Sequence, residues 1–278
     1  MRYVLTRDPG EFAARTERFL SEHLECNVLA TALMRVLDGG LRDPPPLFAY
    51  GLATGEDVGF AALRTPPWPL LASPLEADAG DLVEQWLAED PELAGVTAVP
   101  RTTRAIAAAW ARHTGGRTRT RMREAMHVLT EVQDPPRSAA GALRIAEPDD
   151  RELLVGWMEE FAREANVTGA AQARAMVDGS MRRQGLFVWE DDQPVSMIGT
   201  NPAVAGVVRM GPVYTPPPQR RRGYAGSAVA SASRRALATG AERCMLFTDL
   251  ANPTSNKIYA EVGYCRRGDW EEVAFVRD

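Results

Sequence analysis

Hydrophobic and polar residues follow two patterns along this chain, one typical of helices and one typical of strands. In the C-terminal half, apolar residues at helical spacing predict a helix that starts near Asp149 or Asp150, a second over 171–183, and an alanine-rich helix between Gly223 and Gly240. Short apolar runs between turn residues predict strands. The predicted order is strand, two helices, three strands, helix, strand, helix and a closing strand over 264–277.

The N-terminal half is predicted to repeat this order with different residues. Each half ends on a helix, a glycine and an arginine-containing closing strand, so the halves read as two copies of one fold. The segments of the first half are strand 1–7, helices 12–19 and 28–37, strands 47–53 and 58–64, helix 82–90, strand 95–100, helix 101–115 and closing strand 120–132.

A stretch of paired prolines and small residues separates the two patterned halves, over residues 131–142. A chain of 278 residues fits two domains of ordinary size. The predicted organisation is therefore a domain over 1–132, a linker over 133–141 and a second domain over 142–278.

Composition narrows the class of protein. Apolar residues make up 45% of the chain and charged residues 25%, as in soluble globular proteins. The net charge of −5 argues against a nucleic-acid partner, and no apolar run is long enough to span a membrane. Three widely spaced cysteines, with no metal-ligand spacing, are expected to be free thiols in a reducing cytoplasm.

The sequence Arg220-Arg221-Arg222-Gly223-Tyr224-Ala225 lies between a predicted strand and a predicted helix. Free backbone N–H groups and the positive end of the helix dipole meet there, and arginines add fork-shaped donors. Such a turn can bind a pyrophosphate. Taken alone, it could equally be a solvated basic turn before an ordinary helix.

Two motifs together make the assignment specific. Arg220-x-x-Gly223-x-Ala225 matches the Arg/Gln-x-x-Gly-x-Gly/Ala signature of the GNAT superfamily of N-acetyltransferases, and residues 248–264, TDLANPTSNKIYAEVGY, resemble the second conserved stretch of that family. The resemblance covers the chain from about residue 142 onward. It implies an α/β fold with a central, mostly antiparallel sheet flanked by helices, and two strands that splay apart at the cofactor site.

The resemblance also implies the cofactor and the roles of individual residues. Acetyl-CoA would be the acetyl donor, with its pantetheine arm paired to backbone groups near Val213 and Tyr214. The backbone amide at Val213 would polarise the acetyl carbonyl, and Tyr259 would protonate the departing thiolate. The residues that the resemblance assigns to the cofactor are Val213, Tyr214, Arg220, Arg221, Arg222, Gly223, Tyr224, Ala225, Gly226, Asn252, Ser255 and Tyr259.

Several of these side chains have an ordinary structural alternative. Tyr259 could only pack against its neighbours, and Asn252 could cap the helix that begins at Pro253. Asp249 is a cap or a contact for substrate or water. Glu160 and Glu164, one helical turn apart, would face the acceptor or solvent, and solvent is favoured.

Neither a direct base nor a metal site is evident near the motifs. The strand before the arginines holds no glutamate, so a water or a carboxylate from elsewhere would take the proton of the amine. All three histidines lie in the N-terminal half, which predicts catalysis without a metal.

The N-terminal half carries acidic residues where the C-terminal half has its arginines. Glu76, Asp78 and Asp81 would repel a pyrophosphate, so this half is expected to bind no cofactor.

The predicted function is transfer of an acetyl group from acetyl-CoA to a primary amine of a small molecule or a peptide. Two alternatives stay open at this point. One is an N-acyltransferase with a longer acyl donor, and the other is a module that binds acyl-CoA, or a partner protein, without turnover.

Overall fold

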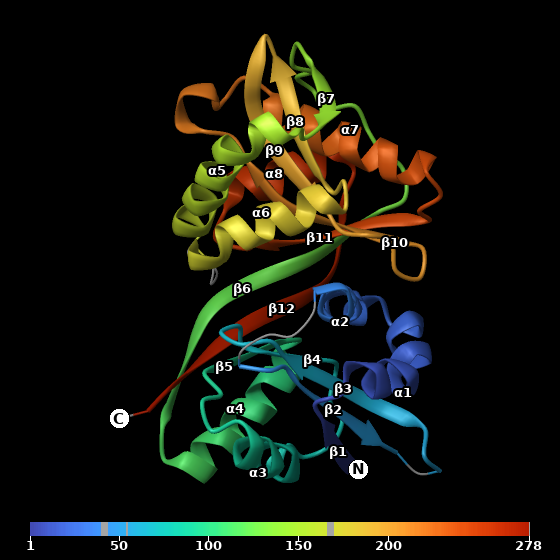
Figure 1. Cartoon of the computed structure of the whole chain (residues 1–278), viewed down its shortest axis with the longest axis vertical. Helices are drawn as coiled ribbons and strands as arrows, with labels where there is room; N and C mark the ends of the chain where they lie inside the picture. Colours follow the sequence, from blue (N-terminus) through green and yellow to red (C-terminus); the bar gives the residue numbers. More distant parts are fainter. Residues whose placement is uncertain (40–43, 54, 166–169, 278) are drawn as a thin grey trace. The chain divides into compact units, whose positions relative to one another are not determined.

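A computed structural model of the chain describes residues 1–39, 44–53, 55–165 and 170–277 (Figure 1). All the predicted helices and strands are confirmed, and the structure adds one short strand, β4, between the prolines at positions 69 and 74. The helices are α1 Pro9–Glu22, α2 Asn27–Gly39, α3 Gly80–Glu89, α4 Pro100–Thr114, α5 Arg151–Glu164, α6 Ala173–Arg182, α7 Tyr224–Ala238 and α8 Pro253–Val262. The strands are β1 Arg2–Thr6, β2 Leu47–Leu52, β3 Val58–Arg64, β4 Leu70–Ala72, β5 Gly95–Ala98, β6 Arg117–Leu129, β7 Ala142–Ile145, β8 Leu186–Asp191, β9 Gln193–Thr200, β10 Val207–Tyr214, β11 Arg243–Asp249 and β12 Cys265–Val276.

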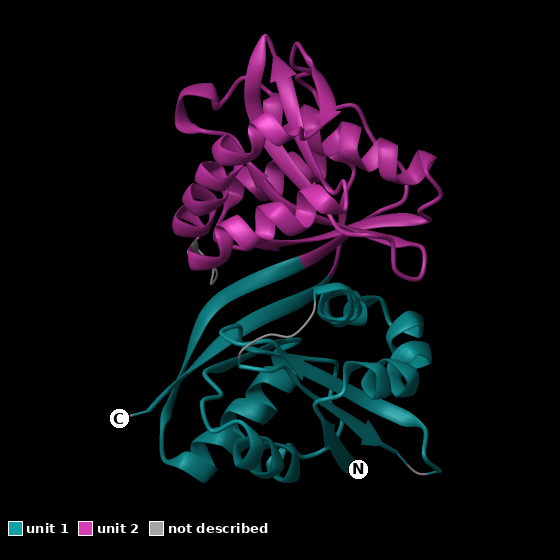
Figure 2. Ribbon diagram, in the orientation of Figure 1, with its two compact units in different colours: residues 1–125, 268–278 teal, residues 126–267 magenta. Residues whose placement is uncertain are grey.

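The chain forms two compact units that divide it differently from the predicted domains (Figure 2). Unit 1 contains residues 1–125 and 268–278, and unit 2 contains residues 126–267. The closing strands cause the difference, because β6 ends in unit 2 and most of β12 lies in unit 1. The closing strand of each half thus contributes to the other half's unit, which the sequence-based limits of 1–132 and 142–278 did not anticipate.

In unit 1 the strands follow the order β1-β2-β3-β4-β5-β12-β6. β12 runs antiparallel to β5, with Glu271 opposite Ala98 and Ala274 opposite Gly95. A Cβ at Gly95 would lie 2.6 Å from the Val273 carbonyl oxygen, so glycine allows this close approach.

Side chains of α4 fix β12 in unit 1. The Trp110 ring stacks on Phe275 with centroids 4.6 Å apart. The Thr103 hydroxyl donates a hydrogen bond to the buried Glu271 carboxylate. Aromatic stacking and a satisfied buried carboxylate both stabilise the exchanged strand.

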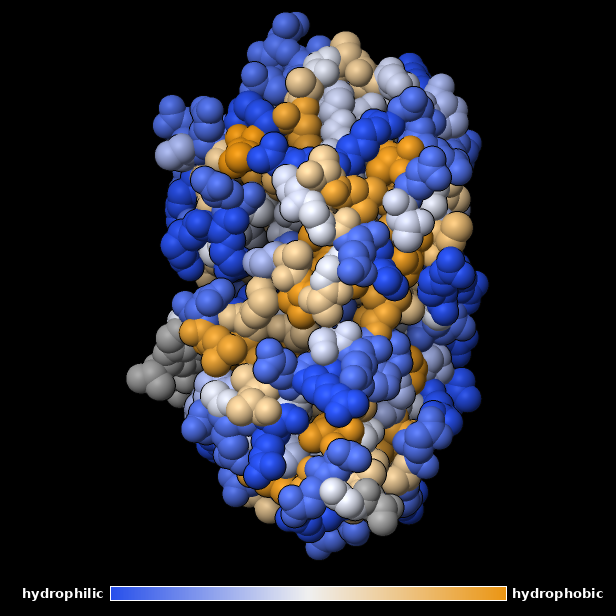
Figure 3. Space-filling view, turned by 90° about the vertical axis from the view of Figure 1, so that its right-hand side faces the viewer, coloured by the Kyte–Doolittle hydropathy of each residue, from blue (hydrophilic) through white to orange (hydrophobic). Residues whose placement is uncertain are grey.

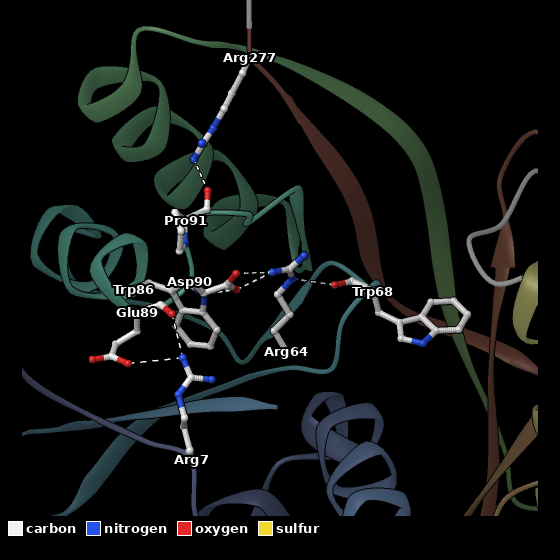
Figure 4. Close-up of polar contacts among 8 residues, drawn as sticks. All are labelled: Arg7, Arg64, Trp68, Trp86, Glu89, Asp90, Pro91 and Arg277. Carbon is white, nitrogen blue, oxygen red and sulfur yellow. Dashed lines mark hydrogen bonds and ion pairs between the residues drawn. The ribbon is translucent and has the colours of Figure 1, made fainter. Parts of the chain in front are cut away.

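A nearly buried ion pair supports the loop between α3 and β5 (Figure 4). Arg64 donates to both carboxylate oxygens of Asp90, and the side chains are only 5% and 14% exposed. The Trp86 indole N–H also donates to Asp90, at 3.1 Å. Arg277, near the chain's C-terminus, donates to the carbonyl of the next loop residue, Pro91.

In unit 2 the strands follow the order β6-β11-β10-β9-β8-β7, and helices cover both faces of this sheet (Figure 1). Successive side chains of a strand point to opposite faces. Leu186 and Val188 pack with α5 and α6, whereas Phe187 and Trp189 pack with α7 and α8. The two faces therefore have separate cores.

Figure 3 shows hydrophilic residues over much of one face of the molecule, with groups of hydrophobic residues between them. Among the described residues, no helix is both long and apolar enough to cross a membrane. The three cysteines are free thiols, as predicted, with Cys26 and Cys244 buried and Cys265 exposed.

Candidate active site

The site is built around two parallel strands, β10 and β11, that pair only at their beginnings. The paired residues run from Val207 with Arg243 to Arg209 with Met245, and both strands then continue toward their carboxyl ends. β10 has an irregularity in its pairing with β9 between Met210 and Val213. A bulge of this kind bends a strand and increases its twist, which turns the end of β10 away from β11.

The sequence explains where this irregularity falls. It contains Gly211 and Pro212, and proline has no N–H to give to the ladder. A Cβ at Gly211 would lie 3.2 Å from the Gly199 carbonyl oxygen, so a side chain there would crowd β9. Beyond the bulge, Val213 and Tyr214 resume pairing with β9.

The side chains of Val213 and Tyr214 point to opposite faces of the sheet. Val213 packs with the cluster under α7 and α8, together with Tyr224 and Tyr259. Tyr214 packs under α5 and α6. The structure thus brings Val213, Tyr224 and Tyr259 together on one face, whereas Tyr214 lies on the other face beside the predicted acceptor residue Glu160.

The arginine turn connects β10 to α7. Arg221 has φ 62° and Gly223 has φ 91°, both in the left-handed region. Gly223 precedes the first residue of α7, Tyr224, and no side chain caps the helix. The first-turn amides of Tyr224, Ala225 and Gly226 have no partner within the helix, as at every helix N-terminus.

The three arginines of the turn differ in their surroundings. Arg220 donates from Nη2 to both carboxylate oxygens of Glu164, at 2.9 and 2.6 Å, and from Nε to the Thr215 carbonyl. Arg222 donates to the Gln219 side chain at 2.6 Å. For the exposed Arg221 side chain, the described part of the chain shows no such acceptor.

Tyr214 lies at the centre of an acidic cluster on the α5 face. Its buried hydroxyl is 2.8 Å from an oxygen of Glu160 and 3.1 Å from one of Glu164. Burial, followed by these two contacts, raises the pKa of Tyr214 above its ordinary value. Both glutamates were expected to face solvent; Glu164 is exposed, whereas Glu160 is half-buried, and both lie within hydrogen-bond distance of this hydroxyl.

Tyr224, the first residue of α7, is also anchored. Its hydroxyl donates to Asp191, and the Arg222 guanidinium lies 5.0 Å from the ring centroid. The hydrogen bond to Asp191 is the main cause that raises the pKa of Tyr224. Its ring is buried, so it acts first as a support for the turn.

Polar side chains stabilise the loop between β11 and α8. Asn252 caps α8 by accepting a hydrogen bond from the Ser255 amide at 3.1 Å. Asp249 accepts from the Ala251 amide, which is a turn contact rather than a helix cap. The Asn256 side chain donates to the carbonyls of Asp249 and Asn252. Asn256 was not among the site residues predicted from the sequence, although it follows Asn252 by one helical turn.

Tyr259, on α8, is half-buried and packs against the α7 and α8 core. Its ring meets that of Tyr264 edge-on, with centroids 6.1 Å apart. Burial raises the pKa of Tyr259 to about 12, so its hydroxyl keeps its proton at neutral pH.

The corresponding turn of unit 1 is acidic. Asp78 accepts a hydrogen bond from the Gly80 amide at 2.6 Å, and Asp81 lies in the first turn of α3. Glu76 forms an ion pair with Arg101. Carboxylates therefore occupy the N-terminus of α3, where the second half has Gly223 and its arginines.

Among the residues that the structure describes, no group of three or more His, Cys, Asp or Glu side chains is placed to hold a metal ion.

Comparisons with known proteins agree with this geometry. Residues 149–264 match the family model "Acetyltransferase (GNAT) family". No curated protein sequence matches the chain. The matched segment contains the diverging strands, the arginine turn and α8, so the candidate site lies within the part of the chain that is similar to GNAT acetyltransferases.

Solved structures share the fold over nearly the whole chain. A GNAT-family acetyltransferase from Colwellia psychrerythraea has 10% identity and a TM-score of 0.59, with 99% of each chain covered. A GCN5-related N-acetyltransferase from Kribbella flavida has 15% identity and a TM-score of 0.62, over 92% of this chain and 96% of the other. A tandem GNAT protein from the clavulanic acid biosynthesis pathway has 14% identity and a TM-score of 0.56, over 99% and 98%. The chain therefore has the predicted tandem GNAT-like fold.

Proposed function

We propose that this protein is an acetyl-CoA-dependent N-acetyltransferase whose active site lies in unit 2. One observation carries the proposal: β10 diverges from β11 beside an arginine turn that opens a long helix, within a segment that matches the GNAT family. Proteins of this family use acetyl-CoA as co-substrate. The amine acceptor belongs to a small molecule or a peptide.

The arginine turn and α8 would hold coenzyme A. Free first-turn amides and the helix dipole suit the pyrophosphate, and the arginines add positive charge. Backbone groups of Val213 and Tyr214, at the diverging end of β10, suit the pantetheine arm as a strand partner. Asn252 and Ser255, at the start of α8, would also contact coenzyme A, as the family resemblance implies.

In this mechanism a neutral amine attacks the acetyl carbonyl. The C–N bond forms, the C–S bond breaks, and coenzyme A leaves as a thiolate. The backbone amide at Val213 would donate to the carbonyl oxygen as negative charge develops on it. Tyr259 would donate a hydrogen bond to the departing thiolate, since its raised pKa keeps the hydroxyl protonated but makes complete proton transfer unfavourable.

The acidic cluster on the opposite face suits a positively charged acceptor. Tyr214 has one hydroxyl proton, yet two carboxylates lie within hydrogen-bond distance of its oxygen. Arg220 neutralises Glu164, which leaves Glu160 as the uncompensated charge among these four groups. An ammonium group would supply the missing positive charge, and Glu160 could accept its proton. Asp249, a further acceptor candidate, is already engaged by the Ala251 amide.

Unit 1 is proposed to bind no cofactor. The carboxylates of Glu76, Asp78 and Asp81 lie where a pyrophosphate would have to bind. Like charges would repel it, and Asp78 already occupies one of the amides. The role of unit 1 is then structural, including support of the exchanged strand β12.

The experiment that tests this proposal has two parts. A panel of primary amines is incubated with acetyl-CoA and the full chain while the release of free thiol is followed, and coenzyme A is titrated calorimetrically without acceptor. The proposal predicts binding together with turnover of at least one amine. Binding without turnover across the panel would support a sensor, and turnover only with longer acyl donors would replace acetyl by another acyl group.

A further inference from the structure

Residues 133–141, the connecting segment, join the two halves of the chain and have no helix or strand. They are nevertheless held at several points within unit 2. The Gln133 amide donates to the carbonyl of Val262 at the end of α8. Asp134 forms an ion pair with Arg234 of α7. The segment therefore follows a fixed course over the two helices that carry the cofactor motifs.

The connecting segment continues along α7 to the arginine turn. A Cβ on Gly226, in the first turn of α7, would lie 3.6 Å from Pro135. The Ala139 amide donates to the Ser227 hydroxyl at 2.9 Å. Between these two contacts lies Arg137, which meets the turn itself.

Arg137 contacts the turn at both of its left-handed residues. Its Nη1 donates to the Arg221 carbonyl oxygen at 2.7 Å. Its own carbonyl oxygen would lie 2.8 Å from a Cβ on Gly223. Glycine at 223 is therefore needed for the approach of the connecting segment as well as for its φ of 91°.

Arg221 needs this support more than its neighbours do. A non-glycine residue with φ 62° is less favourable than one in the helical or extended regions, and it persists only where surrounding contacts hold it. The hydrogen bond from Arg137 is a contact of this kind, and its donor carries a charge, which strengthens it.

We propose that Arg137 is a positioning residue for cofactor binding. It fixes the turn from Arg221 to Gly223 so that the first amides of α7 are presented to the phosphates of coenzyme A. The segment joining the two halves is then part of the cofactor site rather than a passive linker. This inference rests on the proposed binding of coenzyme A at the turn.

Calorimetric titration of coenzyme A into four full-length proteins tests the role: wild type, R137A, R137K and S138A. R137A should raise Kd about tenfold, as expected for the loss of one charge-assisted hydrogen bond. R137K keeps a charged donor of similar reach and should stay within about threefold of wild type. Ser138 is the exposed neighbour in the same segment, so S138A should bind as wild type does.

Hydrogen exchange of the ligand-free proteins separates positioning from direct contact with phosphate. Amides 221–225 should exchange faster in R137A than in wild type and R137K. Unchanged or tighter binding by R137A would overturn the proposal. Equal weakening in R137A and R137K, with unchanged exchange, would also overturn it, because that result indicates a guanidinium that touches the phosphates directly. If wild type itself binds no coenzyme A, the proposed function fails, and the exchange data alone decide whether Arg137 fixes the turn.

Discussion

Replacing Tyr259 by phenylalanine should lower kcat while leaving the affinity for coenzyme A nearly unchanged. The ring would still pack beside Tyr264, and only the hydroxyl is lost. The size of the effect follows from the two pKa values. Burial raises the pKa of Tyr259 to about 12, whereas a free thiol has a pKa of about 8.5.

Complete proton transfer from this tyrosine to the thiolate would therefore be uphill, by about 1.4 kcal/mol for each unit of pKa difference. The hydroxyl gains most by donating a hydrogen bond to the developing thiolate. A hydrogen bond to a charged group contributes about 1.5 to 3 kcal/mol, which corresponds to a loss of roughly tenfold to a hundredfold in kcat.

Steady-state kinetics with a good amine acceptor measure this loss, and calorimetry measures the affinity. The matched control is Y264F, which removes the neighbouring buried hydroxyl that contacts Ser233. Y264F should keep kcat. Since the Tyr259 hydroxyl loses its proton only near pH 12, it should cause no fall in rate up to about pH 11. Equal kcat for wild type and Y259F would refute the role and leave Tyr259 as a packing residue.

Three further predictions concern charged side chains. R221A should raise the Kd of coenzyme A more than R220A does, because the Arg220 side chain is already paired with the Glu164 carboxylate. Calorimetric titration of coenzyme A into each variant compares the two Kd values. E160Q should raise KM for a cationic amine several-fold without changing coenzyme A affinity, and an unchanged KM would remove Glu160 from the acceptor site. R64M should lower the free energy of unfolding by about 3 to 5 kcal/mol, because it leaves the nearly buried Asp90 carboxylate without the Arg64 guanidinium. Urea denaturation measures this change, and a decrease of less than about 1 kcal/mol would contradict the prediction.

Most of the fold was predictable because each element has a local signal. The helix α7 follows from its alanine-rich stretch, with Gly223 before it and Gly240 after it. Neither the position of β12 in unit 1 nor the end of β6 in unit 2 was predictable. Both closing strands are long, and both follow a helix and a glycine, so either one satisfies the pattern of either sheet. The choice depends on contacts such as Trp110 with Phe275, which lie far apart in the sequence.

The candidate site was predictable where its residues are close together in the chain. The arginine turn and the start of α8 are short motifs, and both were located from the sequence. The contacts of Tyr214 with Glu160 and Glu164, and of Arg137 with Arg221, join residues 50 to 84 positions apart. No local pattern encodes such contacts, so they required the three-dimensional structure.

The central claim is that coenzyme A binds once per chain, at the N-terminus of α7. Ala225 allows a direct test, because it lies in the first turn of α7 with ordinary helical geometry. A glutamate there suits the helix dipole and should not disturb folding. It would nevertheless place a negative charge against the phosphates. The uncharged A225Q variant is the matched control for side-chain size.

Calorimetric titration of coenzyme A into wild type, A225E and A225Q is therefore the most direct measurement. One coenzyme A per wild-type chain is predicted, with binding lost in A225E and at most about tenfold weaker in A225Q. Two coenzyme A molecules per chain, or an A225E variant that binds as tightly as A225Q, would contradict the account.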